Sequence, residues 1–272
     1  MAYSVRSAVS RLRGVLVCFA ALILMASPAL AQDHNQSAST STQASSQPPD
    51  FMLGRPRGSV GIKGGWFMAG AKSDFYDFVT DQFTIEKKDF NTAFVTFDFG
   101  VNVTPRLDVT GAIDFGKMNK SSEDRDEEEL LSNGTRVPIQ QTTELSQKIV
   151  TAAAKFYLMP RGHSVSRLAW IPNAFVPYVG AGAGMGKYQL RQNGDFVDFQ
   201  DHHIFTDTFT SEGWVPVITA FGGTEIQMYK RLMLSLEGRY SWSSAELSSD
   251  FVSFEPLDLG GFRLGVGINF TF

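Results

Sequence analysis

The chain has 272 residues, so its length allows either one large domain or two small ones. Its formal net charge of −4 gives no electrostatic reason to expect a nucleic-acid partner, and we predict none. The 25 Gly and 11 Pro residues, together with 23 Phe, are typical of many strands joined by turns rather than of a helical bundle. The composition therefore predicts an all-β protein.

The first 31 residues have the three parts of a secretory signal peptide. A basic region with three arginines comes first, an apolar run follows from 15 to 25, and Ala29 and Ala31 occupy the small-residue positions of a cleavage site. The run is shorter than the roughly 20 residues that a membrane-spanning helix needs. We predict cleavage after Ala31. The single cysteine, Cys18, lies inside the run, so the exported chain is expected to have neither a thiol nor a disulfide.

Residues 32–57 are predicted to form a flexible periplasmic N-terminal tail. The stretch from 32 to 50 is rich in Ser, Thr and Gln and contains no aromatic residue. Such a segment buries too little apolar surface to offset the entropy cost of ordering it. The folded domain is therefore expected to begin at Gly58.

From Gly58 to Phe272 the hydrophobic pattern has a period of two, which indicates strands that are apolar on one face. Eight such segments are found. Short connections are expected near 104–106, 159–174 and 229–231, and long polar ones at 71–89, 117–144, 189–212 and 244–258. Outer-membrane barrels arrange periplasmic turns and extracellular loops in this alternating way.

Periodicity alone does not separate a soluble sandwich from a membrane barrel. The signal peptide, strands long enough to cross a bilayer at 9–11 tilted residues, and aromatic residues near the strand ends favour the barrel. Closure also removes the edge strands that lipid would leave unpaired. We therefore predict a monomeric, eight-stranded, antiparallel up-and-down transmembrane β-barrel over 58–272, with its apolar face toward lipid.

The segment from about Gly58 to Phe272 resembles the small eight-stranded outer-membrane barrels, namely the OmpA-type transmembrane domain and its OmpW- and opacity-protein-like relatives. Three stretches carry the resemblance: PYVGAGAG at 177–184, LEGRY at 236–240 and GINFTF at 267–272. It does not extend to the peptidoglycan-binding domain of OmpA itself, so cell-wall tethering is not implied.

The resemblance implies several partners. In that family the barrel-assembly machinery recognises an alternating apolar last strand that ends in Phe, so Phe270 and Phe272 would be an assembly signal and the machinery a partner during biogenesis. The resemblance also implies a location in the bacterial outer membrane, with outer-membrane lipid and lipopolysaccharide as neighbours.

The charged residues on the polar faces of the strands are predicted to form an ion-pair network in the barrel lumen. The interior of an eight-stranded barrel is just wide enough for side chains, and lone buried charges cost several kcal/mol. A proton- or substrate-handling site is the alternative. The residues of the predicted network are Lys63, Asp98, Asp108, Asp114, Lys155, Glu225, Glu237, Arg239 and Arg263.

The glycines of residues 180–186 do not predict a nucleotide-binding loop. They recur at every second residue, no G-x-G-x-x-G occurs, and no helix is expected to follow. We predict that they relieve crowding inside a narrow barrel.

Two loop motifs contain residue types that could bind a metal ion or catalyse a reaction. Asp198, Asp201, His202, His203 and Asp207 are residue types suited to zinc or to a hydrolase. They belong to one loop, however, and no His falls on a predicted strand, so we predict no metal site, no cofactor and no catalytic residue. The acidic run at 123–129 could bind divalent cations, but a solvated loop is the preferred interpretation.

The predicted function is that of a non-enzymatic outer-membrane surface protein that contributes to envelope integrity and contacts the exterior through its loops. Two alternatives stay open. The barrel could be a narrow channel for ions or small molecules, or a hydrolase could lie at its rim and use the cluster between Asp198 and Asp207.

Overall fold

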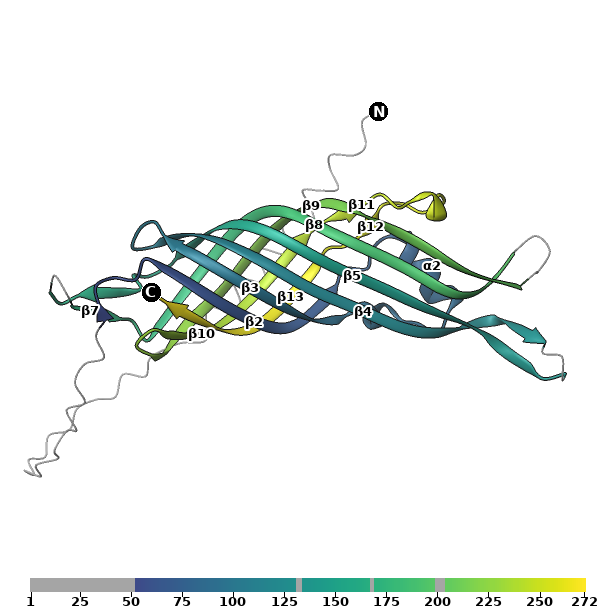
Figure 1. Cartoon of the computed structure of the whole chain (residues 1–272), viewed down its shortest axis with the longest axis horizontal. Helices are drawn as coiled ribbons and strands as arrows, with labels where there is room; N and C mark the ends of the chain where they lie inside the picture. Colours follow the sequence, from purple (N-terminus) through teal and green to yellow (C-terminus); the bar gives the residue numbers. More distant parts are fainter. Residues whose placement is uncertain (1–51, 131–133, 167–168, 199–203) are drawn as a thin grey trace, which may run out of the picture. The chain divides into compact units, whose positions relative to one another are not determined.

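A computed structural model of the chain describes residues 52–130, 134–166, 169–198 and 204–272 (Figure 1). Eight strands pair antiparallel with their neighbours, and β13 pairs with β2 to close the sheet into a barrel. The predicted eight-stranded up-and-down barrel is confirmed. The barrel strands are β2 (Gly58–Ala69), β3 (Thr92–Asn102), β4 (Leu107–Leu130), β5 (Arg136–Tyr157), β8 (Phe175–Val197), β9 (Ile204–Tyr229), β10 (Leu232–Trp242) and β13 (Gly261–Thr271).

The outward-facing side chains form a continuous apolar band around the barrel. On β2, Val60, Ile62 and Trp66 are 47%, 49% and 53% exposed, while the intervening Lys63 is buried. On β13, Leu264 is 58% exposed between two buried neighbours. A soluble monomer rarely exposes a contiguous apolar patch of more than a few hundred Å². This band is the surface that lipid covers in a transmembrane barrel.

Four strands continue far beyond the apolar band. β4, β5, β8 and β9 have 24, 22, 23 and 26 residues, whereas a tilted strand crosses the bilayer in about 9–11. The prediction of long loops at 117–144 and 189–212 was therefore wrong over most of their length. Most side chains of these segments are polar, as in a loop, although Met118, Ile139 and Leu190 are buried apolar residues. Cross-strand pairing satisfies the backbone groups outside the lipid.

The other two long connections also fold. Residues 71–89 contain α2 (Asp74–Gln82) and the start of η1 (Lys87–Phe90), and residues 244–258 contain β11 (Ser244–Ala245), η2 (Ser249–Phe251) and β12 (Leu257–Asp258). In α2 the apolar residues Phe75, Tyr76 and Val79 share one side of the helix and are buried. No helix within the described ranges is long and apolar enough to span a membrane. We call the barrel end that carries α2 the long-loop end.

A small sheet lies at the opposite end, where the C-terminus is also found (Figure 1). It consists of β1 (Met52–Leu53), β7 (Ala169–Pro172) and β6 (Gly162–Ser164), in that order. β1 falls within the segment predicted as a tail, and β6 and β7 fall within a predicted short connection. The chain therefore makes backbone pairing contacts before the first barrel strand begins.

Close approach of β5 and β8 depends on two glycines. Gly182 and Gly184 on β8 lie opposite Ala153 and Thr151 of β5. A Cβ atom added to Gly184 would lie 1.9 Å from the carbonyl oxygen of Val150. The glycines were predicted to relieve crowding inside the barrel, and the crowding they relieve comes from the backbone of the adjacent strand.

We expect Gly184→Ala to lower the free energy of unfolding of the barrel by about 1–3 kcal/mol, because the wall must shift to admit a methyl group. The measurement is urea unfolding of the refolded protein in lipid, followed by heat-modifiable gel mobility. Gly64→Ala is the control, since its added Cβ has no contact closer than 3.7 Å. Equal stability of the two variants would contradict this account of the wall.

Candidate functional site

Glu237 on β10 is the centre of a charge cluster in the lumen. Its carboxylate accepts hydrogen bonds from Lys63 Nζ at 3.1 Å and from Tyr178 Oη at 2.9 Å. Arg239 donates to it from Nη2 at 2.8 Å and from Nε at 3.1 Å. Lys63 also contacts Asp98 Oδ1 at 3.2 Å. These bonds join β2, β3, β8 and β10 across the barrel interior.

A second charge cluster lies toward the end that carries the C-terminus. Lys155 on β5 is ion-paired with Glu225 on β9, and its Nζ lies 3.8 Å from the ring centroid of Tyr178. The hydroxyl of Tyr157 is 3.1 Å from Asp108 Oδ2 and 3.3 Å from Glu225 Oε1. Protein groups therefore supply the donors to Glu225 and to Oδ2 of Asp108 in this buried site.

Arg161 is a lumenal residue that the sequence analysis missed. It follows the end of β5, and its Nη1 donates to Asp108 Oδ2 at 2.9 Å and to Asn102 Oδ1 at 2.6 Å. The predicted network holds five acids and four bases, and Arg161 brings the bases to five. The excess of one acid in the predicted network indicated that a further cation was needed. The strand pattern could not identify Arg161 as that cation, because Arg161 lies in a connection and not on a strand face.

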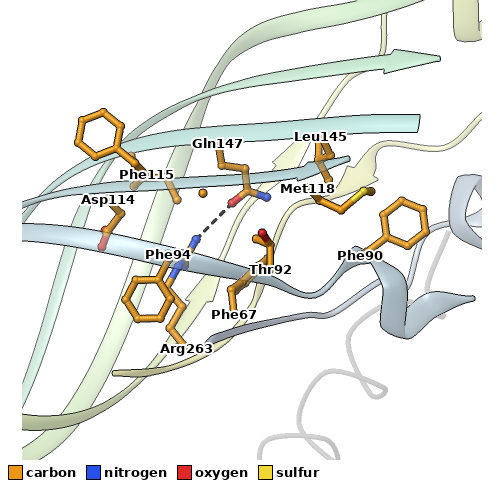
Figure 2. Close-up of a pocket in the computed structure, with 12 residues that line it drawn as sticks. Phe67, Phe90, Thr92, Phe94, Asp114, Phe115, Met118, Leu145, Gln147 and Arg263 are labelled. Carbon is orange, nitrogen blue, oxygen red and sulfur yellow. Dashed lines mark hydrogen bonds between the residues drawn. The ribbon is translucent and has the colours of Figure 1, made fainter. Parts of the chain in front are cut away.

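Arg263 differs from the other predicted network residues. It donates to Ser241 Oγ at 3.0 Å and to Gln147 Oε1 at 3.2 Å, and its guanidinium lies 4.4 Å from the ring centroid of Phe67. Figure 2 shows it beside a cavity of about 20 Å³, which is room for about one water molecule. Among the described residues it has no carboxylate within ion-pair distance, whereas the other eight predicted residues each take part in an ion pair.

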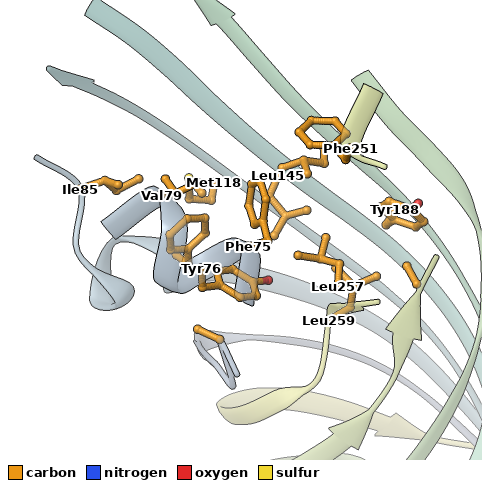
Figure 3. Packing of buried hydrophobic residues seen from close by; sticks show 14 of the residues in the cluster. Phe75, Tyr76, Val79, Ile85, Met118, Leu145, Tyr188, Phe251, Leu257 and Leu259 are labelled. Atoms are coloured by element: carbon orange, nitrogen blue, oxygen red, sulfur yellow. The ribbon is translucent and has the colours of Figure 1, made fainter. Parts of the chain in front are cut away.

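An apolar core fills the long-loop end of the barrel, and we call it the plug (Figure 3). Phe75 is at its centre, with ring centroids of Tyr76, Phe251 and Phe254 at 5.7, 5.9 and 5.6 Å. The barrel wall and the loops both contribute. The buried residues of the plug are Ala71, Phe75, Tyr76, Val79, Phe83, Ile85, Phe90, Met118, Leu145, Tyr188, Leu190, Val215, Ala245, Phe251, Leu257 and Leu259.

Polar contacts join the loops of the plug to one another and to the barrel wall. The hydroxyl of Tyr76 donates to the carbonyl oxygen of Asp258 at 2.7 Å, and burial raises the pKa of this phenol, so that it stays a donor. Asp124 on β4 is buried and accepts a hydrogen bond from Gln82 Nε2 at 2.9 Å. Arg125 Nε donates to the carbonyl oxygen of Phe83 at 2.8 Å. The acidic run at 123–129 was predicted to be solvated, and for Asp124 that prediction was wrong.

The possible metal or hydrolase cluster between Asp198 and Asp207 lies partly within the described residues. Asp201, His202 and His203 lie outside the described residues. Asp207 is described, and its Oδ1 accepts a hydrogen bond from the backbone N–H of Thr208 at 2.7 Å. Within the described ranges, no three His, Cys, Asp or Glu side chains are close enough to hold a metal ion.

The residues of the predicted assembly signal close the barrel seam. Phe270 and Phe272 point outward and are 44% and 55% exposed. The backbone N–H of Phe272 donates to Gly58 O at 3.0 Å, and its carbonyl oxygen accepts from the N–H groups of Arg57 and Gly58 at 2.7 and 3.0 Å. The end of the last strand is therefore paired with the start of the first.

Structural comparison finds similar outer-membrane proteins. OprG from Pseudomonas aeruginosa matches with a TM-score of 0.45 at 12% identity, over 81% of this chain and 99% of that one. Neisserial surface protein A matches at 0.43 and 10%, over 79% and 97%. Ail of Yersinia pestis, solved with the heparin analogue sucrose octasulfate, matches at 0.38 and 15%, over 79% and 99%. No protein-family model and no curated sequence matches the chain.

We expect Glu237→Ala to lower the free energy of unfolding by about 3–5 kcal/mol, because Lys63 and Arg239 lose the carboxylate that they share in a buried site. Urea unfolding followed by tryptophan fluorescence measures the change. Glu128→Ala is the control, since this exposed carboxylate lies 3.8 Å from Arg136, and its loss should cost less than about 1 kcal/mol. Similar losses in both variants would show that the lumenal cluster does not stabilise the barrel.

Proposed function

We propose that this protein is a non-enzymatic surface protein of the bacterial outer membrane, that its barrel is closed to solutes, and that it acts through its exterior. The signal peptide, cleaved after Ala31, would direct export, and residues 32–57 would remain periplasmic. The barrel-assembly machinery would recognise Phe270 and Phe272. Outer-membrane lipid and lipopolysaccharide would then surround a single barrel and its long strands.

The observation that carries this proposal is that two barriers, one of ion pairs and one of apolar side chains, follow each other along the lumen. The first barrier consists of the ion-paired side chains that cross the lumen at Glu237 and at Glu225. Beyond them, the plug closes the long-loop end, with Val79 and Ile85 fully buried. Close packing in both barriers supports an interior that stabilises the barrel and does not pass solutes. The function would then depend on the outer wall and the loops.

The extended strands support a role at the cell exterior. β4 and β5 remain paired up to Leu130 and Arg136, and β8 and β9 up to Val197 and Ile204. Two hairpins therefore project well past the apolar band at the long-loop end (Figure 1). Rigid, paired hairpins present side chains at fixed positions at low entropy cost, which suits contact with lipid headgroups or with external partners.

The channel alternative predicts conductance, and our proposal predicts a silent barrel. We expect no reproducible conductance steps from the refolded mature protein in a planar bilayer. Val79→Asp, which disrupts the plug, should also be silent because the lumenal ion pairs remain. Heat-modifiable mobility is the check that each protein is folded. Steps in the wild type that change in Arg263→Ala would establish the lumen as a pathway and overturn the proposal.

The envelope role is tested in cells. We expect a strain that lacks the protein to take up more of a hydrophobic fluorescent dye than its parent, because an embedded barrel contributes to lateral packing of the membrane. Expression of the wild type should restore the barrier, and so should the channel-test variant Arg263→Ala. Unchanged dye uptake in the deletion strain would remove envelope integrity from the proposed function.

A further inference from the structure

A groove of about 460 Å³ lies in the outer wall of the barrel, where β3 and β4 part. Pairing between these strands begins at Phe94 and Gly116, and beyond this point β4 continues toward the long-loop end paired with β5 but not with β3. Residues of β3, β4, β5 and β8 line the groove. Val95 and Phe115 form its apolar side, and both are outward-facing and more than 40% exposed.

The groove lies at the boundary of the apolar band. On three strands in succession, the outward position directly beyond the last apolar residue is a lysine. These pairs are Phe115 and Lys117 on β4, Val150 and Lys148 on β5, and Met185 and Lys187 on β8. In a membrane-spanning barrel this level meets the lipid headgroups on the long-loop side.

The positive charge at this level is only partly neutralised. Lys148 lies directly opposite Lys187 in the β5–β8 register, and like charges in that position repel. Lys117 and Lys187 have glutamate partners, Glu144 at 3.2 Å and Glu212 at 3.4 Å. Among the described residues, Lys148 has no carboxylate within 4 Å.

Arg191 adds a further cation to the same groove. It lies opposite Glu144 in the register, but that carboxylate is occupied by Lys117 at 3.2 Å and by Asn119 Nδ2 at 2.7 Å. Arg191 likewise has no ion-pair partner among the described residues. Four cations against two carboxylates therefore leave a net charge of about +2 on an outward face next to lipid.

We propose that this groove binds the phosphorylated headgroup of an outer-leaflet glycolipid, the lipid A part of lipopolysaccharide. The phosphates lie against Lys148 and Arg191, and an anion there relieves the repulsion between Lys148 and Lys187. The acyl chains lie along Val95, Phe115 and Val150, which continue the apolar band. The inference rests on the proposed outer-membrane location, and it names the partner of the outer wall.

The test uses the full mature protein, refolded in detergent, with purified diphosphoryl lipid A as the probe and native mass spectrometry as the readout. We expect the double variant Lys148→Gln/Arg191→Gln to bind lipid A at least about tenfold more weakly than the wild type. The double variant Lys87→Gln/Lys88→Gln is the control, because it removes the same charge from exposed lysines of η1. Binding of dephosphorylated lipid A should be weak in all three proteins.

A thermal measurement keeps the proposal testable if binding is hard to quantify. Without lipid A, Lys148→Gln should melt at the same temperature as the wild type or higher, because a like-charge pair is removed. With lipid A, its stabilisation should be smaller than that of the wild type. The same measurement with inorganic phosphate tests whether a free anion is enough. Inorganic phosphate should stabilise the wild type much less than lipid A does, because it makes no apolar contacts.

Three outcomes would overturn the groove as a lipid site. They are equal lipid A binding by the groove variant and the wild type, equal binding of dephosphorylated lipid A by the wild type, and stabilisation by inorganic phosphate that equals that by lipid A. Failure of the proposed function is distinguishable, because it would appear as conductance of the wild-type barrel while lipid A binding by the groove persists.

Discussion

The backbone groups of every segment within the lipid must be hydrogen-bonded inside the protein, and the rest of the structure depends on this constraint. The seam between β2 and β13 meets it by pairing Gly58 with Phe272 at one end and Ala69 with Gly261 at the other. Closure with eight strands leaves an interior only as wide as its own side chains. A narrow interior in turn forces the polar faces of the strands to satisfy one another, because little water can reach them.

The lumenal ion pairs follow from that narrow interior. Glu237, Glu225 and Asp108 each meet more than one donor, and tyrosines from β5 and β8 supply neutral donors among them. Arg161 reaches in from outside the strands to pair with Asp108. Beyond the lipid, where water could enter, the interior changes character and the apolar plug replaces the ion pairs. The ion pairs therefore fill the part of the barrel within the lipid, and the apolar plug fills the part beyond it.

The outer wall follows a different rule, because its solvent changes along the strand. Apolar side chains face lipid, and the lysines at the next outward position on β4, β5 and β8 face headgroups. The repulsion between Lys148 and Lys187 costs stability unless an anion lies between them. The proposed closed interior and the proposed lipid-binding groove both assign the activity of the protein to its outer surface.

The sequence by itself determined the strand number, the inward and outward faces and the all-β class, because a period of two is local and survives in any barrel register. Tertiary structure alone decided three things. It decided that 117–144 and 189–212 pair as strands, since their polar residues resemble a loop until a partner strand is present. It decided that α2 folds inward as a plug, because its short apolar face needs the barrel wall. It also decided which lumenal charges meet, because those contacts join strands whose separation in the sequence carries no pairing information.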